Sequence, residues 1–462
     1  MMAEYLKWLT TTWDLCYAVQ GGRPAIEARS TSRFNNLVRF AREHSRFYQQ
    51  RYRYLPAGII QREGLPPVTK VELMTHFDDW VTDPAVKRAD VEAFIADPAR
   101  VGQPYLGRYA VWTSSGTTGE LGIFLHDNDA LAVYDGLQTA RFGHTAFTPM
   151  VFASMAPNGA RYEMVAATGG HFAGVASIER LRRLNPLMAA TARVFSILQP
   201  LPELVAQLND FQPSYLATYP TAMLLLAEEQ SNGRLQIKPV TLWTGGEWLC
   251  PASRAEIERV FHCQTVDEYG ASEFLSIAHG CGEGWLHLNA DWVILEAVDA
   301  CYRPVSAGVA SHTVLMTNLA NRVQPFIRYD LGDSIALKPD PCRCGSPLPA
   351  LRVEGRRDEI LALQTPSGIT VRLLPLALAT VIEQEAHCHR FQLVQTGPDT
   401  LSVRLDAPKG TEERAAWRRV RHCLHEFLCS QGLPHAHIKH DPAPPQPDRV
   451  SGKCRQVISE LH

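Results

Sequence analysis

The chain has 462 residues, with 45 Lys and Arg against 48 Asp and Glu and a formal net charge of -3 at pH 7. This length exceeds one ordinary hydrophobic core, so we expect two or three domains. The 45% share of hydrophobic residues excludes a disordered chain, a collagen-like chain and a small disulfide scaffold. The near-neutral charge lacks the basic excess that contact with many phosphates requires, so we expect no nucleic-acid partner.

The sequence also argues against a membrane or secreted protein. No segment approaches the ~18 consecutive apolar residues of a membrane-spanning helix. The first 14 residues include Glu4 and Asp14 and lack a basic start, so they do not resemble a signal peptide. We therefore expect a cytoplasmic protein without a membrane partner, whose 11 cysteines are thiols or metal ligands and not disulfides.

In chain order, the predicted elements change character twice. The first hundred residues are predicted to be helical, with apolar residues at three-to-four spacing across 33–52. From 109 to about 353, short apolar runs alternate with helical stretches, which predicts an α/β fold with mixed or parallel sheets and crossover helices. Near Gly355 this pattern stops. Strands at 391–395 and 401–405, a helix at 412–430 and a proline-rich tail then predict a small α+β domain.

One loop is rich in hydroxyls and glycines. Val111 and Trp112 are followed by Thr113-Ser114-Ser115-Gly116-Thr117-Thr118-Gly119. The backbone amides of such a loop can approach a ligand closely, and its hydroxyls can donate to phosphate oxygens, so it suits a polyphosphate. The loop lacks the spacing of a P-loop, which disfavours a Walker-type kinase or ATPase. Taken alone, it also fits a flexible turn.

Further short loops combine glycine with an acid, an aromatic residue or a base. They are Thr244-Gly245-Gly246-Glu247, Glu268-Tyr269-Gly270-Ala271-Ser272-Glu273, Arg328-Tyr329-Asp330-Leu331-Gly332-Asp333, Gly355-Arg356-Arg357-Asp358 and Ser451-Gly452-Lys453. In this order, the set resembles the adenylate-forming (acyl-AMP) ligase superfamily, and most closely its phenylacetate–CoA ligase-like branch. The segments 40–48 and 66–70 are also similar to that branch.

The resemblance implies a binding site for ATP and Mg²⁺. Its phosphate-binding residues would be Ser114, Ser115, Gly116, Thr117, Thr118 and Gly119. Its adenosine-binding residues would be Gly245, Gly246, Glu247, Glu268, Tyr269, Gly270 and Asp333, with Tyr269 stacked on adenine and Asp333 accepting from the ribose hydroxyls.

The same resemblance implies the residues around the reacting phosphate. Ser272 would contact the α-phosphate, Glu273 would hold Mg²⁺ through its carboxylate, and Arg356 would lie near ribose and phosphate. Two alternatives stay open. Arg328 and Asp330 would form the relevant pair in one, and Arg356 would serve only in a surface ion pair in the other.

The carboxy-terminal motif implies a two-step reaction. Lys453 matches the lysine that bridges the carboxylate and the α-phosphate, two anions that repel each other as they react. Asp358 matches the hinge about which a small domain rotates between adenylation and transfer to a thiol. The resemblance thus implies a large adenylation domain at 1–357 and a small mobile domain at 358–462.

Four residues have the chemistry of a zinc site. Cys281 and His287 lie in one glycine-bordered segment, and Cys342 and Cys344 lie in another. Three thiolates and an imidazole suit tetrahedral zinc, so we predict structural Zn²⁺ there. Free thiols in turns are the alternative, and His279 competes with His287 as the fourth ligand.

The residues of the acyl pocket are the part of the site that the sequence predicts least well. The resemblance implies an aromatic or related acid, with pocket candidates Tyr134, Phe142, Tyr219, Pro220 and Ala271. The segment after the hinge, 368–383, departs from the superfamily pattern on the acceptor side. The acceptor is therefore coenzyme A, the pantetheine of a carrier protein, or an amine.

The expected activity is that of an AMP-forming acid–thiol ligase. Its expected partners are a small carboxylic acid and coenzyme A or an acyl carrier protein, with a homodimer as a further candidate assembly. An acyl-AMP-dependent amide synthetase and a non-enzymatic zinc-ribbon interaction module are the alternatives.

Overall fold

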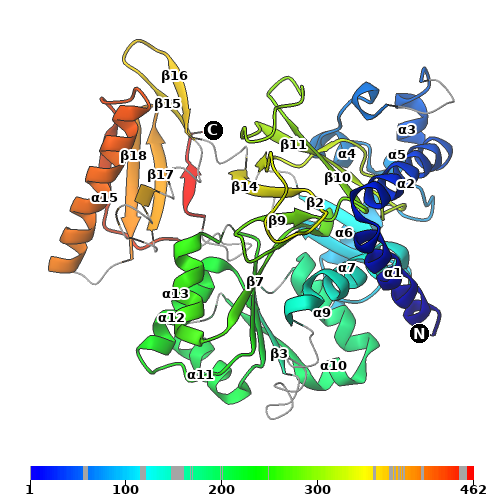
Figure 1. Ribbon diagram of the computed structural model, residues 1–462, viewed down its shortest axis with the longest axis horizontal. Helices are drawn as coiled ribbons and strands as arrows, with labels where there is room; N and C mark the ends of the chain where they lie inside the picture. The colour runs from blue at the N-terminus through cyan, green and yellow to red at the C-terminus, as the bar shows by residue number, and fades with distance from the viewer. Residues whose placement is uncertain are drawn as a thin grey trace.

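The computed structural model (Figure 1) describes most of the chain. The described residues are 2–55, 61–114, 121–146, 161–166, 168, 170–197, 199, 201–247, 249–356, 361–373, 378, 381–382, 386, 388, 391–406, 410–446 and 455–461. The side chains of Phe142 and Arg356 are outside this description, although their backbones lie in a helix and a strand.

A nine-stranded sheet forms the centre of the large part of the molecule, with strand order β13-β14-β9-β8-β7-β6-β5-β3-β4. Its strands are β3 (Tyr162–Ala166), β4 (Ala192–Ser196), β5 (Tyr215–Thr218), β6 (Thr241–Gly245), β7 (Gln264–Ala271), β8 (Phe274–Gly280), β9 (Leu286–Leu288), β13 (Asp333–Leu337) and β14 (Ala350–Arg356). From β4 to β7 neighbouring strands are parallel, and from β7 to β13 they are antiparallel. The predicted α/β class, with mixed or parallel sheets and crossover helices, is confirmed, and the central sheet is mixed.

Helices cover both faces of the parallel half (Figure 1). They are α7 (Asn128–Ala146), α9 (Ala173–Leu184), α10 (Pro186–Thr191), α11 (Leu201–Phe211), α12 (Pro220–Ser231) and α13 (Pro251–Phe261). Side chains of α11, α12 and α13 share one core with Leu216 and Leu242 of the sheet, while α7 contacts β7 and β8. Proline opens α12 and α13 at the first helical position, where its missing N–H costs no hydrogen bond.

The first hundred residues are helical, as predicted. It contains α1 (Met2–Gln20), α2 (Gly22–His44), α3 (Arg46–Arg51), η1 (Arg62–Gly64), α4 (Lys70–Thr75), α5 (Phe77–Trp80), α6 (Arg88–Ile95) and η2 (Pro98–Arg100). The apolar face of 33–52 is buried, and Tyr48 donates a hydrogen bond to the Pro325 carbonyl at 3.0 Å. These helices therefore pack on the large core and not on a separate one.

Two small sheets join that core. One pairs β1 (Ala110–Ser114) with β2 (Gly122–His126), and the other contains β10 (Val293–Val298), β11 (Thr313–Asn318) and β12 (Tyr329–Asp330). The β1–β2 hairpin carries the predicted phosphate loop at its turn, where Ser114 pairs with Gly122.

The last hundred residues have a hydrophobic core of their own, on the left in Figure 1. Their elements are β15 (Leu361–Gln364), β16 (Thr370–Leu373), β17 (Phe391–Gly397), β18 (Thr400–Leu405), α15 (Thr411–Ser430), β19 (His437–Asp441) and β20 (Val457–Ser459). Val420, Leu424 and Leu428 are buried on one side of α15, which is the helical spacing that the sequence predicts. The predicted hinge Asp358 and the proposed domain boundary fall at 357–360, outside the described residues.

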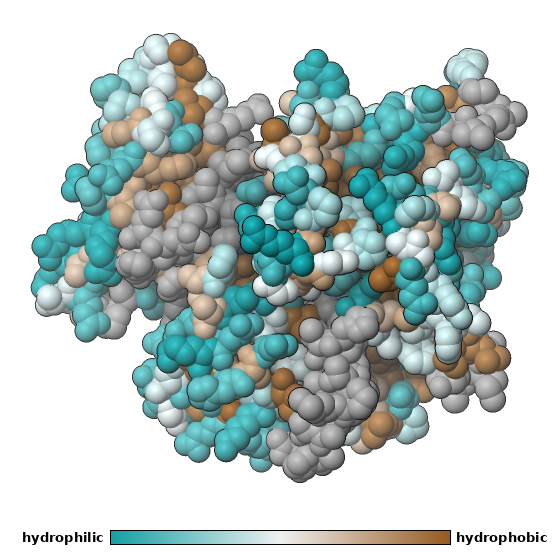
Figure 2. All heavy atoms as spheres, viewed as in Figure 1, coloured by the Kyte–Doolittle hydropathy of each residue, from teal (hydrophilic) through white to brown (hydrophobic). Residues whose placement is uncertain are grey.

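Hydrophilic side chains predominate over α15 on the face shown in Figure 2, and apolar side chains are scattered over that face. Among the helices of the described segments, none is long and apolar enough to cross a membrane.

Candidate active site

The two-residue turn between β7 and β8 carries Ser272 and Glu273. A glycine is required just before it, because a Cβ at Gly270 would lie 2.0 Å from the Leu275 carbonyl oxygen. The Ser272 hydroxyl donates to the Thr113 carbonyl at 3.3 Å. This contact brings the β7–β8 turn against β1, directly before the predicted phosphate loop.

His126, at the end of β2, supports the same turn. Its Nε2 lies 2.9 Å from the Ser272 carbonyl oxygen, and its Nδ1 lies 3.1 Å from the Tyr134 hydroxyl. Burial lowers the pKa of His126 to about 3, so the ring is neutral and can donate through Nε2 while accepting through Nδ1. His126 therefore fixes the backbone of Ser272.

Glu273 is 6% exposed. Its Oε1 accepts a hydrogen bond of 2.7 Å from the Tyr329 hydroxyl, and its backbone carbonyl accepts from Asn318 at 2.8 Å. The carboxyl is therefore held in one position next to Ser272. A fixed carboxylate oxygen of this kind suits a hard divalent cation such as Mg²⁺.

The adenosine candidates gather where β6 and β7 end. Gly245 pairs with Glu268, and Gly246 has a positive φ of 80° that glycine adopts without strain. On β7, the Tyr269 hydroxyl donates to Asp333 Oδ2 at 2.5 Å. In the backbone register of β13 and β14, Asp333 lies opposite Arg356. Residues far apart in the sequence thus meet at one edge of the sheet.

The alternative pair has other partners. Asp330 accepts hydrogen bonds from Tyr302 at 2.8 Å and Thr313 at 2.5 Å. Arg328 bonds to Glu296 at 3.1 Å and to backbone carbonyls before β1, and it is 4% exposed. Both side chains are held by contacts within the fold.

Other predicted site residues are placed as follows. Tyr134 is fully buried and hydrogen bonds to Asn318 and His126, so it belongs to the core. Tyr219 and Pro220 open α12, and Ala271 ends β7. Residues Ser115 to Gly119 and Lys453 lie outside the described residues, as do the side chain of Phe142 and that of Arg356.

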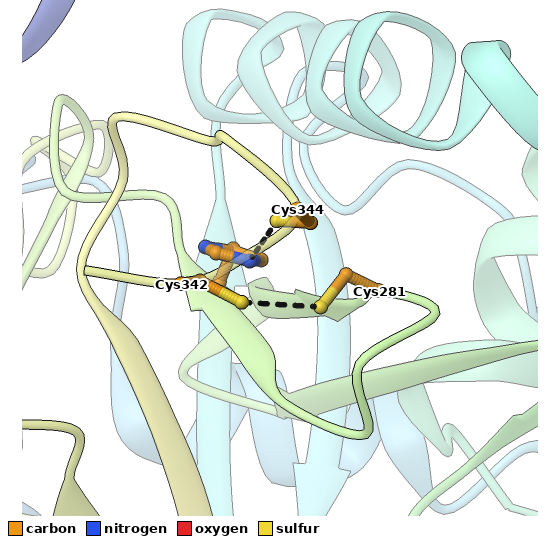
Figure 3. Close-up of side chains that lie close together, drawn as sticks. Cys281, Cys342 and Cys344 are labelled. Atoms are coloured by element: carbon orange, nitrogen blue, oxygen red, sulfur yellow. Dashed lines mark hydrogen bonds between the residues drawn. The ribbon is translucent and has the colours of Figure 1, made fainter. Parts of the chain in front are cut away.

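The four predicted zinc ligands come together (Figure 3). Their ligand atoms all lie within 4.8 Å of one another. Cys281 and Cys342 point toward each other with their Sγ atoms 3.8 Å apart, and Cys344 Sγ lies 3.1 Å from His287 Nε2. Two thiolates bound to tetrahedral zinc at about 2.3 Å are about 3.8 Å apart, so the spacing of the first pair fits the metal.

The imidazole of this cluster is oriented for ligation. Its Nδ1 lies 3.1 Å from the Leu348 carbonyl and donates to it. This bond fixes the tautomer in which Nε2, the atom next to Cys344, carries no proton and can bind a metal. Burial lowers the pKa of His287, so the neutral, ligating form is favoured. Among the described residues, His287 and not His279 lies with the three thiols.

Comparisons with known proteins match this architecture. A solved structure of 2-hydroxyisobutyryl-CoA ligase in the postadenylation state, with its acyl-AMP, aligns with a TM-score of 0.66 over 95% of this chain and 90% of that chain, at 19% identity. The chain has the fold of the adenylate-forming ligases. An open form of the same ligase gives a TM-score of 0.57 at 20% identity, covering 94% of this chain and 91% of that one. Anthranilate CoA ligase AuaEII with anthranoyl-AMP gives 0.50 at 14% identity, covering 75% of this chain and 65% of that one.

The match found by sequence comparison covers a smaller part of the chain. Protein CapK of Staphylococcus aureus is 25% identical over 224 residues, so the chain spans about half the length of this curated relative, and the match covers 48% of the chain itself. No family model matches. The likeness to adenylate-forming ligases therefore rests on the fold.

Two residues that support the candidate site, His126 and Tyr329, have no local sequence signal for that role. His126 stands at the end of an apolar strand, and nothing in its neighbours marks it as a partner of Ser272. Tyr329 belongs to a motif that the sequence singles out, but only the structure shows its bond to Glu273.

Proposed function

We propose that the chain is an ATP-dependent, AMP-forming acid ligase. The observation that carries this proposal is the contact of Ser272 with Thr113, at the base of the β1–β2 loop. Glu273 follows Ser272 in the same turn, and the Tyr269–Asp333 pair lies a few residues back along β7. These contacts support the proposed positions of phosphate, cation and ribose at one edge of the sheet. Ligands of open α/β sheets bind at this edge, where the parallel strands end.

In the first step, a carboxylate oxygen of the acid bonds to the α-phosphorus of ATP, and the bond to the pyrophosphate oxygen breaks. Ser272 donates to the α-phosphate, Asp333 accepts from ribose, and Lys453 neutralises the two anions as they meet. Mg²⁺, held by Glu273, would balance the charge of the leaving pyrophosphate. The products are acyl-AMP and pyrophosphate.

In the second step, a pantetheine thiolate attacks the acyl carbon, the bond from this carbon to the phosphate oxygen breaks, and AMP leaves. The thiol proton passes to solvent. Coenzyme A and a carrier protein are the proposed acceptors. Rotation of a mobile domain at 358–462 about Asp358 would remove Lys453 from the site and let the acceptor thiol enter. An aromatic acid remains the proposed substrate, from the resemblance to the phenylacetate–CoA ligase-like branch.

We also propose that Cys281, His287, Cys342 and Cys344 hold a structural Zn²⁺. The cluster joins the β8–β9 turn to the loop before β14, close to the strand that carries Arg356. Four protein ligands leave no position open for substrate, which favours a structural role.

Pyrophosphate–ATP exchange tests the activity directly. The protein should return label from pyrophosphate to ATP only with an accepted acid, over a panel of aryl, arylacetic and small aliphatic acids. Coenzyme A, a holo-carrier protein and amines are then supplied separately to the active acid. Tight ATP binding without exchange on any acid contradicts the proposal, and an amide product alone makes the protein an amide synthetase.

A further inference from the structure

A groove lies between α15 and β19, in the part of the chain that has its own hydrophobic core. Its volume is about 520 Å³. α15 lies on the outer side of this part, away from the nine-stranded sheet (Figure 1). Among the described residues of the candidate active site and the zinc cluster, none lines this groove. The basic side chains that line it are Arg418, Arg421, His422, His425, His437 and Lys439.

The groove carries an excess of positive charge. Among the described residues that line it, none is acidic. Arg418 donates to the backbone carbonyl of Arg414 at 3.3 Å. Within the described part of the chain, Arg421 and Lys439 form no ion pair. Because the whole chain has a net charge of -3, this collection of cations is a local departure from its charge balance.

Two acids lie near the histidines of the groove. A carboxylate oxygen of Glu426 is 3.5 Å from His422, and one of Asp399 is 3.9 Å from His437. All four side chains are exposed, so water screens these contacts. The arginines of the groove therefore keep their charge for an anionic ligand.

β19 turns its backbone edge toward the groove. The groove is lined by four consecutive residues, 436–439. Successive side chains of a strand point to opposite faces of a sheet, so this run follows the edge of β19 and not one face. β19 is the outer strand in the order β19-β18-β17-β20. The His437 amide donates to the Asp399 carbonyl at 2.8 Å, so the amide of the next residue, Ile438, points away from β18.

The helix wall of the groove has spacings that suit an extended chain. Ile438 and Trp417 pack against the core beneath α15 and give the groove an apolar floor. Arg418 and Arg421 are exposed and about 4.5 Å apart along the helix axis. Alternate side chains of an extended chain are ~7 Å apart on the same face. The long arginine side chains can reach two such positions.

These features together favour an extended acidic segment as the occupant. The edge of an outer strand binds a peptide through main-chain hydrogen bonds, and the peptide's alternate side chains then decide its specificity. Charged side chains beside a strand edge also prevent indiscriminate pairing with other strands. The cations of this groove repel a basic strand and attract an acidic one.

We propose that the groove between α15 and β19 is a docking site for an extended acidic segment of another protein. The segment adds a strand beside β19, and its alternate carboxylates pair with Arg418 and Arg421. This interaction is separate from the proposed adenylation, and the experiment that tests it does not depend on ligase activity.

A labelled peptide of alternating Glu and Thr, with blocked ends, provides the test. Its binding to the full chain is measured by fluorescence anisotropy. The peptide should bind, and binding should weaken as salt is added, because salt screens exposed charges. Arg421→Glu and Arg418→Glu should each weaken binding by about fivefold or more, because each replaces an attraction by a repulsion. Arg183→Glu, at an exposed position of α9, makes the same change in net charge and should bind as the wild type does.

Matched peptides separate charge from strand pairing. A peptide with Gln in place of Glu keeps the backbone and should bind at least about fivefold more weakly. A peptide with N-methylated amides keeps the carboxylates but cannot pair with a strand, and it should also bind more weakly. Hydrogen exchange by the amides of 436–441 should slow when the acidic peptide is bound, and exchange in α9 should not change.

Several outcomes would overturn this inference. They are absence of binding at low salt, equal binding of a peptide with Lys in place of Glu, and equal binding by Arg183→Glu and Arg421→Glu. Equal binding of the N-methylated peptide, with no slowing of exchange in β19, rejects the added strand. Displacement of the peptide by pyrophosphate at matched ionic strength makes the groove a phosphate site instead. If the arginine variants do not fold, the Gln, Lys and N-methylated peptides on the wild type decide.

Discussion

The Tyr269 hydroxyl donates to the Asp333 carboxylate at 2.5 Å, across 64 residues of sequence. This bond holds one oxygen of Asp333 toward the end of β7. Tyr269 is 8% exposed and Asp333 is 6% exposed, so both are held by their surroundings. We propose that an acid fixed in this way accepts hydrogen bonds from the two neighbouring hydroxyls of ribose.

Substitution of this pair should weaken ATP binding unequally. Asp333→Ala should raise the KM for ATP by about tenfold or more, because it removes charge-assisted hydrogen bonds to ribose. Tyr269→Phe keeps the ring and loses one bond, so its effect should be less than tenfold. Exchange kinetics at varied ATP measure both. Asp330→Asn, at an acid with internal partners, should instead lower thermal stability, and a KM effect equal to that of Asp333→Ala would reassign the ribose acid.

The sequence predicts the class of fold because the apolar runs of β3, β5 and β6 alternate with helices that begin at Pro220 and Pro251. It also predicts the zinc ligands, since glycine-bordered cysteines are a local signal. It does not predict the contacts of His126 and Tyr329, because His126 lies 146 positions from Ser272 and Tyr329 lies 56 positions from Glu273. Side-chain contacts across a sheet depend on strand order, which no local pattern contains.

Lys453 should act in only one of the two half-reactions. Lys453→Ala should slow adenylation by about 10²–10³-fold, because it removes the cation that offsets the repulsion between the substrate carboxylate and the α-phosphate in the transition state. Transfer from preformed acyl-AMP to the thiol should change by less than about threefold. Single-turnover assays of each half-reaction measure the two effects. Lys439→Ala on β19 is the matched control, and equal losses in both half-reactions for Lys453→Ala would contradict the assigned exchange about Asp358.

The cysteine cluster should bind one zinc per chain. Metal analysis of the purified protein should find this stoichiometry, and Cys342→Ser or His287→Ala should lose it. Removal of the metal should lower the melting temperature by ~5 °C or more, because ligation stabilises only the folded state. Cys301→Ser, at an exposed thiol outside the cluster, should keep the metal.

Activity separates a structural from a catalytic zinc. If the metal only joins the β8–β9 turn to the loop before β14, exchange at low temperature should survive its removal with a chelator. A complete and immediate loss of exchange, without unfolding, would instead place the metal in the reaction.

Glu163 should make stability fall as pH rises. Burial raises the pKa of this β3 carboxyl to about 9, above its ordinary value of 4.5, against weaker opposing effects of the Phe195 backbone and Arg193. The folded state therefore holds a proton that the unfolded state releases, so this contribution is full below pH 4.5 and is lost progressively up to about pH 9. Glu163→Gln, which stays neutral, should match the wild type near pH 5 and exceed it at pH 8.5 by on the order of a few kcal/mol.

Urea unfolding between pH 5 and pH 8.5 measures this difference. The urea concentration at the midpoint should fall with pH more steeply in the wild type than in Glu163→Gln, because only the wild type has the Glu163 carboxyl. Other buried carboxyls, such as Asp267, whose pKa burial raises to about 6, contribute equally to both proteins. Glu43→Gln, at an exposed carboxyl of α2, should follow the wild-type curve. Parallel curves for Glu163→Gln and the wild type would show that Glu163 is ionised in the folded protein and is stabilised there by Arg193.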